Sequence, residues 1–299
     1  MLKALLTVGI ALAAILAAQD LSVAEALLAK GELSQALAFL EENQTGSARW
    51  HFLASKVLDD LDQPTRAAEE AQTAVELAPD NAGYRLHLGR IFLTRNNPAA
   101  AQQIYAEALE RFPSNVYLRL GNALAFNKLR LYEEAQVEFE TCLGQLPSLG
   151  LALDGLMEAH LERLKYDDAL KAAVEYRERN PQDFRGYYHS AVAQEKLGSD
   201  PEALERLLHQ ALEFNGRFAP AHALLGKTLL QLGRNQEAIL ALEAAVRLRP
   251  DYLLGRLHLA RAYRKVGRLE DAKKEAEIVK ELERRQHEPV PSLRRQSGS

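Results

Sequence analysis

A proline recurs at a fixed interval through most of the chain, and this period constrains the fold more than any other feature of the sequence. The prolines of the series are Pro79, Pro113, Pro147, Pro181 and Pro250, and Gly216 stands at the intervening step. Most of the steps measure 34 residues. A period of this length indicates repeated units that bury their apolar faces only by stacking on one another. We therefore expect a stacked array of repeats and not one globular core.

Small side chains recur in two columns of the same register. Alanine fills the first column at Ala36, Ala67, Ala101, Ala135, Ala169, Ala203, Ala238 and Ala272. Seven residues later comes a second small site, filled by Ala74, Ala108, Cys142, Ala245 and, after one inserted residue, Ala211. Small residues at these intervals are expected where two helices approach closely. Cys142 is accordingly interpreted as a small apolar core residue and not as a redox or nucleophilic group.

Each unit has the sequence signals of two helices joined by a tight turn. The turn column, five residues before the alanine, holds Gly31, Gly198, Gly233 and Gly267, with Asp62 and Asn96 in the same place. These residue types best tolerate the left-handed backbone that ends a helix. Arg130 and Leu164 depart from this rule. Because Pro64, Pro98 and Pro201 stand where a second helix would begin, we expect two antiparallel helices in each unit.

The unit from Ala82 to Pro113 resembles the tetratricopeptide repeat. The residues that match its pattern are Leu88, Gly89, Phe92, Ala101, Tyr105, Ala108 and Pro113. The resemblance covers about residues 22–285 as eight units and fits least well at Met157, His160, Ala173, Tyr176 and Gln194. It implies an all-α fold: a right-handed superhelical solenoid of about eight antiparallel helix pairs, over residues 19–285.

The resemblance also implies where a partner would bind. In this family the first helix of each unit lines the concave side of the solenoid, and members typically hold an extended or helical segment of another protein there. The residues of the groove-facing columns are Arg49, Lys56, His87, Arg90, Tyr117, Asn127, Asp154, Glu158, Arg185, Tyr188, Lys227, Arg261 and Arg264. All except His87 are predicted to contact the partner.

Charge is unevenly distributed along these columns. Asp154, Glu158 and Glu162 are spaced one turn apart on one expected helix, where repulsion between like charges costs roughly 0.2 to 0.5 kcal/mol per pair. They form either a solvated acidic face or a contact for a basic partner segment. A basic stretch that could face acidic partner residues follows at Lys227, Arg261, Arg264 and Lys265.

The two ends of the chain differ from the repeats. Residues 1–18, MLKALLTVGIALAAILAA, are predicted to be an export signal, because Lys3 precedes an uncharged stretch that is short for a membrane span. An uncleaved signal anchor is the alternative. After cleavage we expect a periplasmic or secreted protein without membrane insertion. Residues 286–299, which include Arg294 and Arg295, are expected to form a disordered basic tail.

Composition and motifs argue against several classes of function. A formal net charge of -4 and a pI near 6.1 disfavour a nucleic-acid binder. The single cysteine cannot form an intrachain disulfide, and the eight histidines show no metal-site spacing. The sequence contains no nucleophile-elbow, phosphate-loop or dinucleotide motif, so no catalytic residue, metal or cofactor is predicted.

The sequence as a whole predicts a non-enzymatic scaffold in the cell envelope that binds a peptide segment or helix of one or more partner proteins in a concave groove. One alternative is a structural spacer that associates with copies of itself, as a homo-oligomer. A less favoured one is an enzyme or carbohydrate-binding solenoid, which would need a clustered polar pocket.

Overall fold

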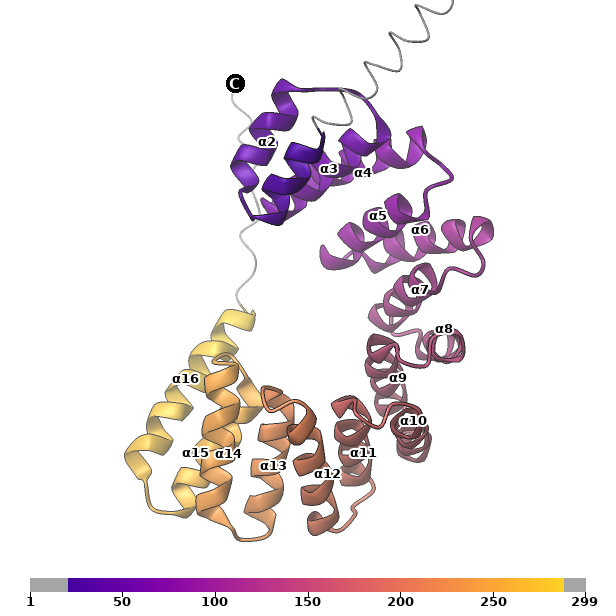
Figure 1. Cartoon of the computed structure of the whole chain (residues 1–299). Helices are drawn as coiled ribbons and strands as arrows, with labels where there is room; N and C mark the ends of the chain where they lie inside the picture. The colour runs from indigo at the N-terminus through magenta and orange to yellow at the C-terminus, as the bar shows by residue number, and fades with distance from the viewer. Residues whose placement is uncertain (1–20, 288–299) are drawn as a thin grey trace, which may run out of the picture. The chain divides into compact units, whose positions relative to one another are not determined.

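The computed structural model describes residues 21–287, which fold into helices joined by short turns and contain no strand (Figure 1). The predicted export signal lies outside these residues, as does the predicted tail beyond His287. The last helix, α16 (Leu269–His287), includes the first residues assigned to that tail. Within the described stretch, the helices fall short of the length and apolar character needed to cross a membrane.

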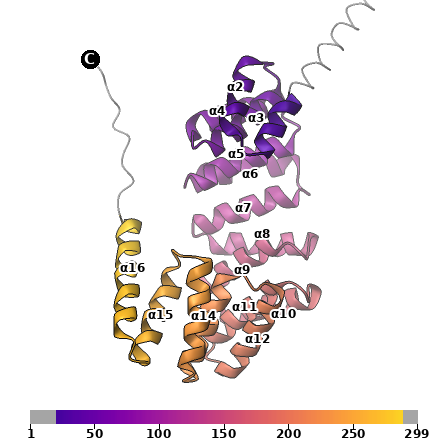
Figure 2. The ribbon, with the colours of Figure 1, turned by 60° about the vertical axis from the view of Figure 1, so that its left-hand side comes forward.

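The helices fall into two compact units, one ending at Leu146 and the other beginning at Pro147. The first unit has a helical stretch over residues 21–29, then α2 (Leu33–Glu42), α3 (Ala48–Asp60), α4 (Pro64–Leu77), α5 (Ala82–Thr94), α6 (Pro98–Arg111), α7 (Val116–Lys128) and α8 (Tyr132–Gln145). The second unit has α9 (Gly150–Glu162), α10 (Tyr166–Arg179), α11 (Phe184–Lys196), α12 (Pro201–Phe214), α13 (Ala219–Gln231), α14 (Asn235–Leu248), α15 (Leu253–Lys265) and α16. Successive helices of a unit pack on one another, as Figures 1 and 2 show. Residues 21–287 thus form eight helix pairs, which confirms the predicted all-α solenoid class.

The turn inside each pair has the left-handed residue that its column predicts. The backbone φ is positive at Gly31, Gly198, Gly233 and Gly267, and also at Asp62, Asn96, Arg130 and Leu164. Arg130 and Leu164, which lack the expected residue type, take φ values of 60° and 58°. The repeat geometry therefore sets this conformation even where the local sequence disfavours it.

The alanine column is buried as predicted, except in the sixth pair. There Ala203 is half-buried, whereas Leu204 is 1% exposed and takes the core position. The cause is the turn before α12, which spans residues 197–200 and is one residue longer than the turns of the neighbouring pairs. Leu208 and Ala211 then follow Leu204 at the usual spacing and are buried. The inserted residue thus lies before the core columns and not within them, which corrects the predicted register.

Cys142 lies on α8 in the second small column and is fully buried. Its Sγ is 3.6 Å from the carbonyl oxygen of Val116 on α7. Burial raises the pKa of the thiol to about 11. A buried thiol that stays protonated at neutral pH is a packing residue and not a nucleophile, as predicted.

Tyr105 on α6 is among the largest fully buried side chains of the first unit, and it is 2% exposed. Its ring lies against Gly89 on α5 and Gly121 on α7, where a Cβ atom would come within 2.5 Å of a ring carbon. The two glycines therefore allow three helices to close around one aromatic ring. Leu242 and Gly226 make the corresponding close contact in the second unit.

Several first helices begin at a side-chain cap. The Ser47 hydroxyl accepts a hydrogen bond from the backbone N–H of Trp50 at 3.2 Å. The side-chain Oδ1 of Asn115 accepts hydrogen bonds from the backbone N–H groups of Tyr117 and Leu118. These caps satisfy backbone donors that the first turn of a helix leaves without partners.

We expect Ser47→Ala to lower the free energy of unfolding of the first unit by about 1 kcal/mol, because the Trp50 N–H loses its acceptor. Ser47→Asp keeps an acceptor at the same place and should retain the wild-type stability. Chemical denaturation followed by tryptophan fluorescence measures both variants. Equal losses in the two variants would show that the cap does not act through the acceptor.

Candidate functional site

Every predicted partner-binding residue lies on the first helix of a helix pair. In the first unit these are Arg49 and Lys56 on α3, Arg90 on α5, and Tyr117 and Asn127 on α7. In the second unit they are Asp154 and Glu158 on α9, Arg185 and Tyr188 on α11, Lys227 on α13, and Arg261 and Arg264 on α15. Neighbouring first helices of a unit also contact each other. Side chains from successive repeats therefore meet on this surface.

Two of the predicted cations of the first unit are engaged by carboxylates of the same unit. The Arg49 guanidinium lies 2.7 Å from Glu25, and that of Arg90 lies 3.1 Å from Asp59. Each pair joins one repeat to the next. Exposed pairs of this kind contribute little stability, but they leave less charge available to a partner.

The other predicted residues of the first unit differ in accessibility. The Lys56 ammonium lies 5.7 Å from the centre of the Phe52 ring, one turn away on the same helix. Tyr117 is 53% exposed, which suits a contact residue. Asn127 is 5% exposed, so its predicted place on an open surface is wrong.

Asn127 occupies a helix position that other first helices also bury. Asn127 is the twelfth residue of α7, a position that is also buried on other first helices, at Asp59 of α3 and Leu230 of α13. On α3 this position faces the following repeat, as the pairing of Asp59 with Arg90 on α5 shows. There it is a contact between repeats of the first unit and not a contact with a partner.

A buried serine and histidine lie side by side between α3 and α5. The Ser55 Oγ is 2.9 Å from Nε2 of His87 and donates a hydrogen bond of 2.7 Å to the carbonyl oxygen of Ala67. The Arg90 guanidinium lies 3.2 Å from Nδ1 of His87. Because an arginine can only donate, Nδ1 accepts, and the ring hydrogen on Nε2 is donated to Ser55.

This arrangement is the reverse of a nucleophile and its base. A catalytic histidine would accept the serine proton, whereas here the serine receives a hydrogen bond from the ring and donates its own proton to a carbonyl. Burial, together with the positive charge of Arg90, lowers the pKa of His87 from 6.5 to about 4. The network is therefore a structural link between two repeats.

The acidic cluster predicted on α9 is partly used inside the second unit. Asp154 accepts hydrogen bonds from Arg185, at 3.2 Å, and from Nε2 of His189, at 2.7 Å, both on α11. Burial would raise the pKa of Asp154, but the hydrogen bond and charge of His189 and the charge of Arg185 outweigh it and hold that pKa below its usual value. Glu158 lies one turn further along α9 and is exposed. Asp154 and Arg185, both predicted partner contacts, thus bind each other.

Tyr188 and Lys227 also have partners within the second unit. The Tyr188 ring packs 4.9 Å from that of Phe218 and 5.1 Å from His189, and burial raises the pKa of its hydroxyl. Lys227 on α13 forms an ion pair with Glu195 on α11. Both side chains join successive repeats.

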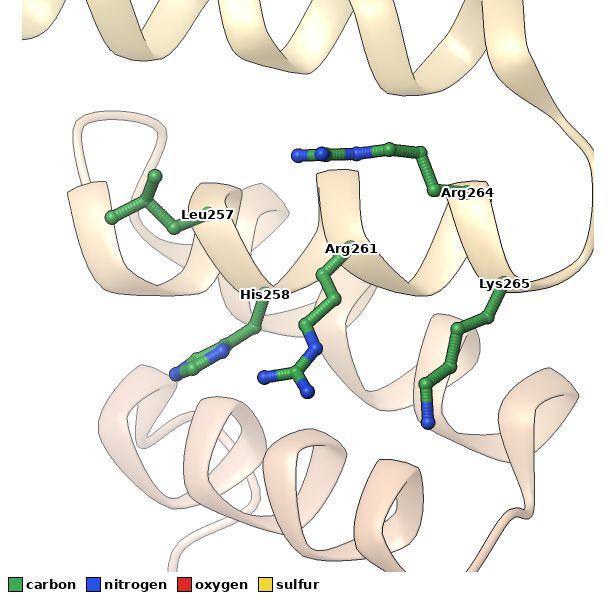
Figure 3. A pocket seen from close by; sticks show the side chains of 5 residues that line it. All are labelled: Leu257, His258, Arg261, Arg264 and Lys265. Atoms are coloured by element: carbon green, nitrogen blue, oxygen red, sulfur yellow. The ribbon is translucent and has the colours of Figure 1, made fainter.

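Helix α15 has a different character, because it is strongly basic. Its sequence, LLGRLHLARAYRK, has four Arg or Lys residues and no Asp or Glu. Arg256 is paired with Glu275 on α16 at 2.7 Å. The other three cations line an open pocket of about 530 Å³, together with Leu257 and His258 (Figure 3).

The pocket holds cations without a carboxylate partner. Among the described residues, no side chain forms an ion pair or hydrogen bond with Arg261 or Arg264, and Lys265 donates only to the carbonyl oxygen of Leu230, at 3.1 Å. Burial and the neighbouring positive charges lower the pKa of His258, so this ring is neutral at neutral pH. Figure 3 shows all five side chains around this pocket, with those of Leu257 and Arg264 above α15 and those of His258, Arg261 and Lys265 below it.

A second pocket, of about 520 Å³, lies at the turn between α10 and α11 and is lined by residues 180–185. Its polar groups serve the turn itself. Asn180 donates to the carbonyl oxygen of Pro147 at 2.8 Å, and Asp183 caps α11 and accepts from the Tyr176 hydroxyl at 2.7 Å. Within residues 21–287, no group of three or more His, Cys, Asp or Glu side chains is placed to hold a metal ion.

Sequence reasoning named Arg261 and Arg264 but missed Leu257 and His258, which line the same pocket. The signal that could have found the site is the absence of any carboxylate from Tyr252 to Leu269, in a chain that is acidic overall.

Comparison with known families identifies tetratricopeptide repeats along most of the chain. One family model of this repeat matches residues 52–115, 86–139 and 156–222, and a second matches residues 229–295. The matched segments include α15 and its basic pocket.

Several proteins of known name or structure are similar to this chain. The human Protein O-mannosyl-transferase TMTC3 is 26% identical over 73% of this chain, which spans only 25% of that protein. Yeast Tom70 superposes with a TM-score of 0.64 at 16% identity, covering 85% of this chain and 57% of Tom70. A tetratricopeptide repeat protein from Parabacteroides merdae gives a TM-score of 0.60 at 18% identity, covering 79% and 96% of the two chains. At such identities the two structures establish a shared fold alone.

Proposed function

Because the chain belongs to the tetratricopeptide repeat family, we propose that it is a non-enzymatic interaction scaffold in the cell envelope, whose first-helix surface binds a segment of a partner protein. A solenoid of this kind exposes a large, regular surface for its size, and binding to that surface needs no catalytic group. The predicted export signal over residues 1–18 supports the envelope location. If the signal is not cleaved, the scaffold is anchored to the membrane.

The observation that carries the proposal is the basic pocket on α15. Most of the other charged residues predicted to bind a partner are engaged within their own unit, as Arg49, Arg90, Asp154 and Lys227 are. The side chains of Arg261 and Arg264 are instead exposed to solvent. Arginine is enriched among the residues that dominate the binding energy of protein interfaces.

An enzymatic role has less support. The name of the human relative describes a transferase, but this chain matches only 25% of that protein. The Ser55–His87 and Asp154–His189 contacts resemble parts of catalytic sites, yet each joins neighbouring repeats of one unit. The polar groups of the pocket at residues 180–185 are likewise committed to the turn.

Crosslinking in the native host tests the proposal. The tagged protein should be crosslinked, purified and compared with an Arg261→Glu/Arg264→Glu variant by mass spectrometry. We expect a distinct envelope protein with the wild type and about tenfold less of it with the variant, because like charges then face the partner. Arg206→Glu, which changes an exposed arginine on α12, is the matched control and should behave as wild type.

Two outcomes would count against this function. Equal recovery of the partner by the α15 variant and the wild type would remove the basic pocket from the binding surface. Recovery of the protein itself alone, with a concentration-dependent mass in light scattering, would favour a self-associating spacer.

A further inference from the structure

Successive first helices contact each other at two regular positions. In the first unit, the fifth residue of α3, Phe52, stacks 4.8 Å from Tyr84, and the twelfth, Asp59, pairs with Arg90 at 3.1 Å. The fifth position is thus covered by the beginning of the following repeat. The twelfth position receives a donor from the following first helix.

The second unit repeats this rule. The fifth residue of α9, Asp154, accepts from two side chains of α11. The fifth residue of α11, Tyr188, packs on Phe218, and its twelfth, Glu195, pairs with Lys227 of α13. The backbone carbonyl oxygen of Leu230, the twelfth residue of α13, accepts a hydrogen bond from the ammonium group of Lys265 on α15. On α3 and α11 both positions contact the following repeat, and on α9 and α13 one of the two does.

On α15 these two positions are occupied by Leu257 and Arg264. Leu257 is 40% exposed and Arg264 is exposed, because no helix among the described residues covers them. In Figure 3 both side chains lie above α15, whereas His258 and Lys265 extend below it towards the neighbouring helices. The face that would continue the stack is therefore open.

The twelfth position of α15 has the opposite charge to that of α3 and α11. Asp59 and Glu195 present a carboxylate at the twelfth position, whereas α15 presents the guanidinium of Arg264, with Arg261 one turn before it. A helix that pairs with this face must bring carboxylates instead of cations. It must also bring an apolar side chain for Leu257 and for Leu254, which is 55% exposed.

We propose that α15 docks an amphipathic, acidic helix of a partner protein, which continues the stack of first helices. Acidic side chains of that helix pair with Arg264 and with Arg261, which lines the same pocket, and apolar side chains cover Leu254 and Leu257. A helix fits because the two open positions are seven residues apart, about 10 Å or two helical turns, so one helix lying alongside spans both. This inference rests on the proposed scaffold function and specifies the class of partner.

Two synthetic peptides test the inference with the full chain. One carries leucine on one helical face and glutamate on the others, and its counterpart has lysine in place of every glutamate. With a fluorescent label on each peptide, anisotropy reports binding to the protein. We expect the glutamate peptide to bind at least about tenfold more tightly than the lysine peptide.

Variants separate the contribution of charge from that of the apolar contact. Arg261→Glu/Arg264→Glu should bind the glutamate peptide more weakly than the wild type does and the lysine peptide more tightly. Unfolding of the variant cannot cause such a reversal of preference. Leu257→Gln should weaken binding of the glutamate peptide, whereas Leu240→Gln, which changes an exposed leucine on α14, should leave it unchanged. A glutamate peptide with the same composition but with scattered leucines should bind more weakly.

Absence of binding, equal binding of the two peptides, or an unchanged preference in the double arginine variant would overturn the acidic-helix inference. None of these results would remove the scaffold function, because the crosslinking experiment tests that function with the native partner. Loss of the crosslinked partner from the double variant without peptide binding would mean that the basic pocket recognises a different kind of segment.

Discussion

Tyr105→Ala is expected to lower the free energy of unfolding of the first unit by about 3 to 5 kcal/mol. The Tyr105 ring is 2% exposed and is held between Gly89 and Gly121. Because glycine has no side chain that could turn into the space left behind, the cavity stays largely unfilled. Denaturant unfolding followed by the fluorescence of Trp50 measures the loss, since Trp50 is the only tryptophan and lies in the same unit.

Tyr117→Ala is the matched control for this loss. Tyr117 lies in the same unit and is 53% exposed, so its removal should change the free energy of unfolding by less than about 0.5 kcal/mol. A Tyr105→Ala protein as stable as Tyr117→Ala would contradict the close packing of α5, α6 and α7 around the ring.

The second large effect is a loss of stability in mild acid caused by His87. The pKa of His87 is about 4 in the folded chain and near 6.5 in the unfolded chain. Between these values the unfolded chain binds a proton that the folded chain does not, so the free energy of unfolding falls as the pH is lowered. The buried side chain, 6% exposed, should therefore account for about 3 kcal/mol of lost stability between pH 7 and pH 4.

His87→Gln tests this effect because glutamine does not titrate and can still donate to Ser55. We expect the variant to lose less stability than the wild type when the pH is lowered, with denaturation followed by circular dichroism. His209→Gln is the control, since the His209 side chain is 61% exposed, and it should follow the wild type. Parallel curves for the wild type and His87→Gln would show that the histidine does not stay neutral in the folded state.

Most of the fold could be predicted because each repeat has the same packing requirement, so the same residue types recur at the same positions. Apart from Ala203, the residues of the alanine column, the turn glycines and Cys142 occupy the expected environments. A column of like residues remains recognisable even where one repeat departs from the pattern. The register failed at Ala203, where a single extra residue can be placed before or within the column and the sequence fits both. Burial of Leu204 decides between them.

The surface could be predicted only in part, because its chemistry depends on pairs of residues from different repeats. Asp154 and Arg185 were both assigned to a partner, yet they lie 31 residues apart in the chain and bind each other. Single positions do not reveal such pairs. The lack of any carboxylate from Tyr252 to Leu269 is the signal in the sequence for the open cations of α15, and the structure shows which cations elsewhere are paired.

The order of packing along the chain also bears on how the protein folds. In each unit, the main helix contacts join elements that are first or second neighbours in the sequence. Contacts of such short separation require little loop closure, which favours rapid folding. Each unit can therefore start to fold from any of its helix pairs and grow in either direction, without waiting for a distant part of the chain.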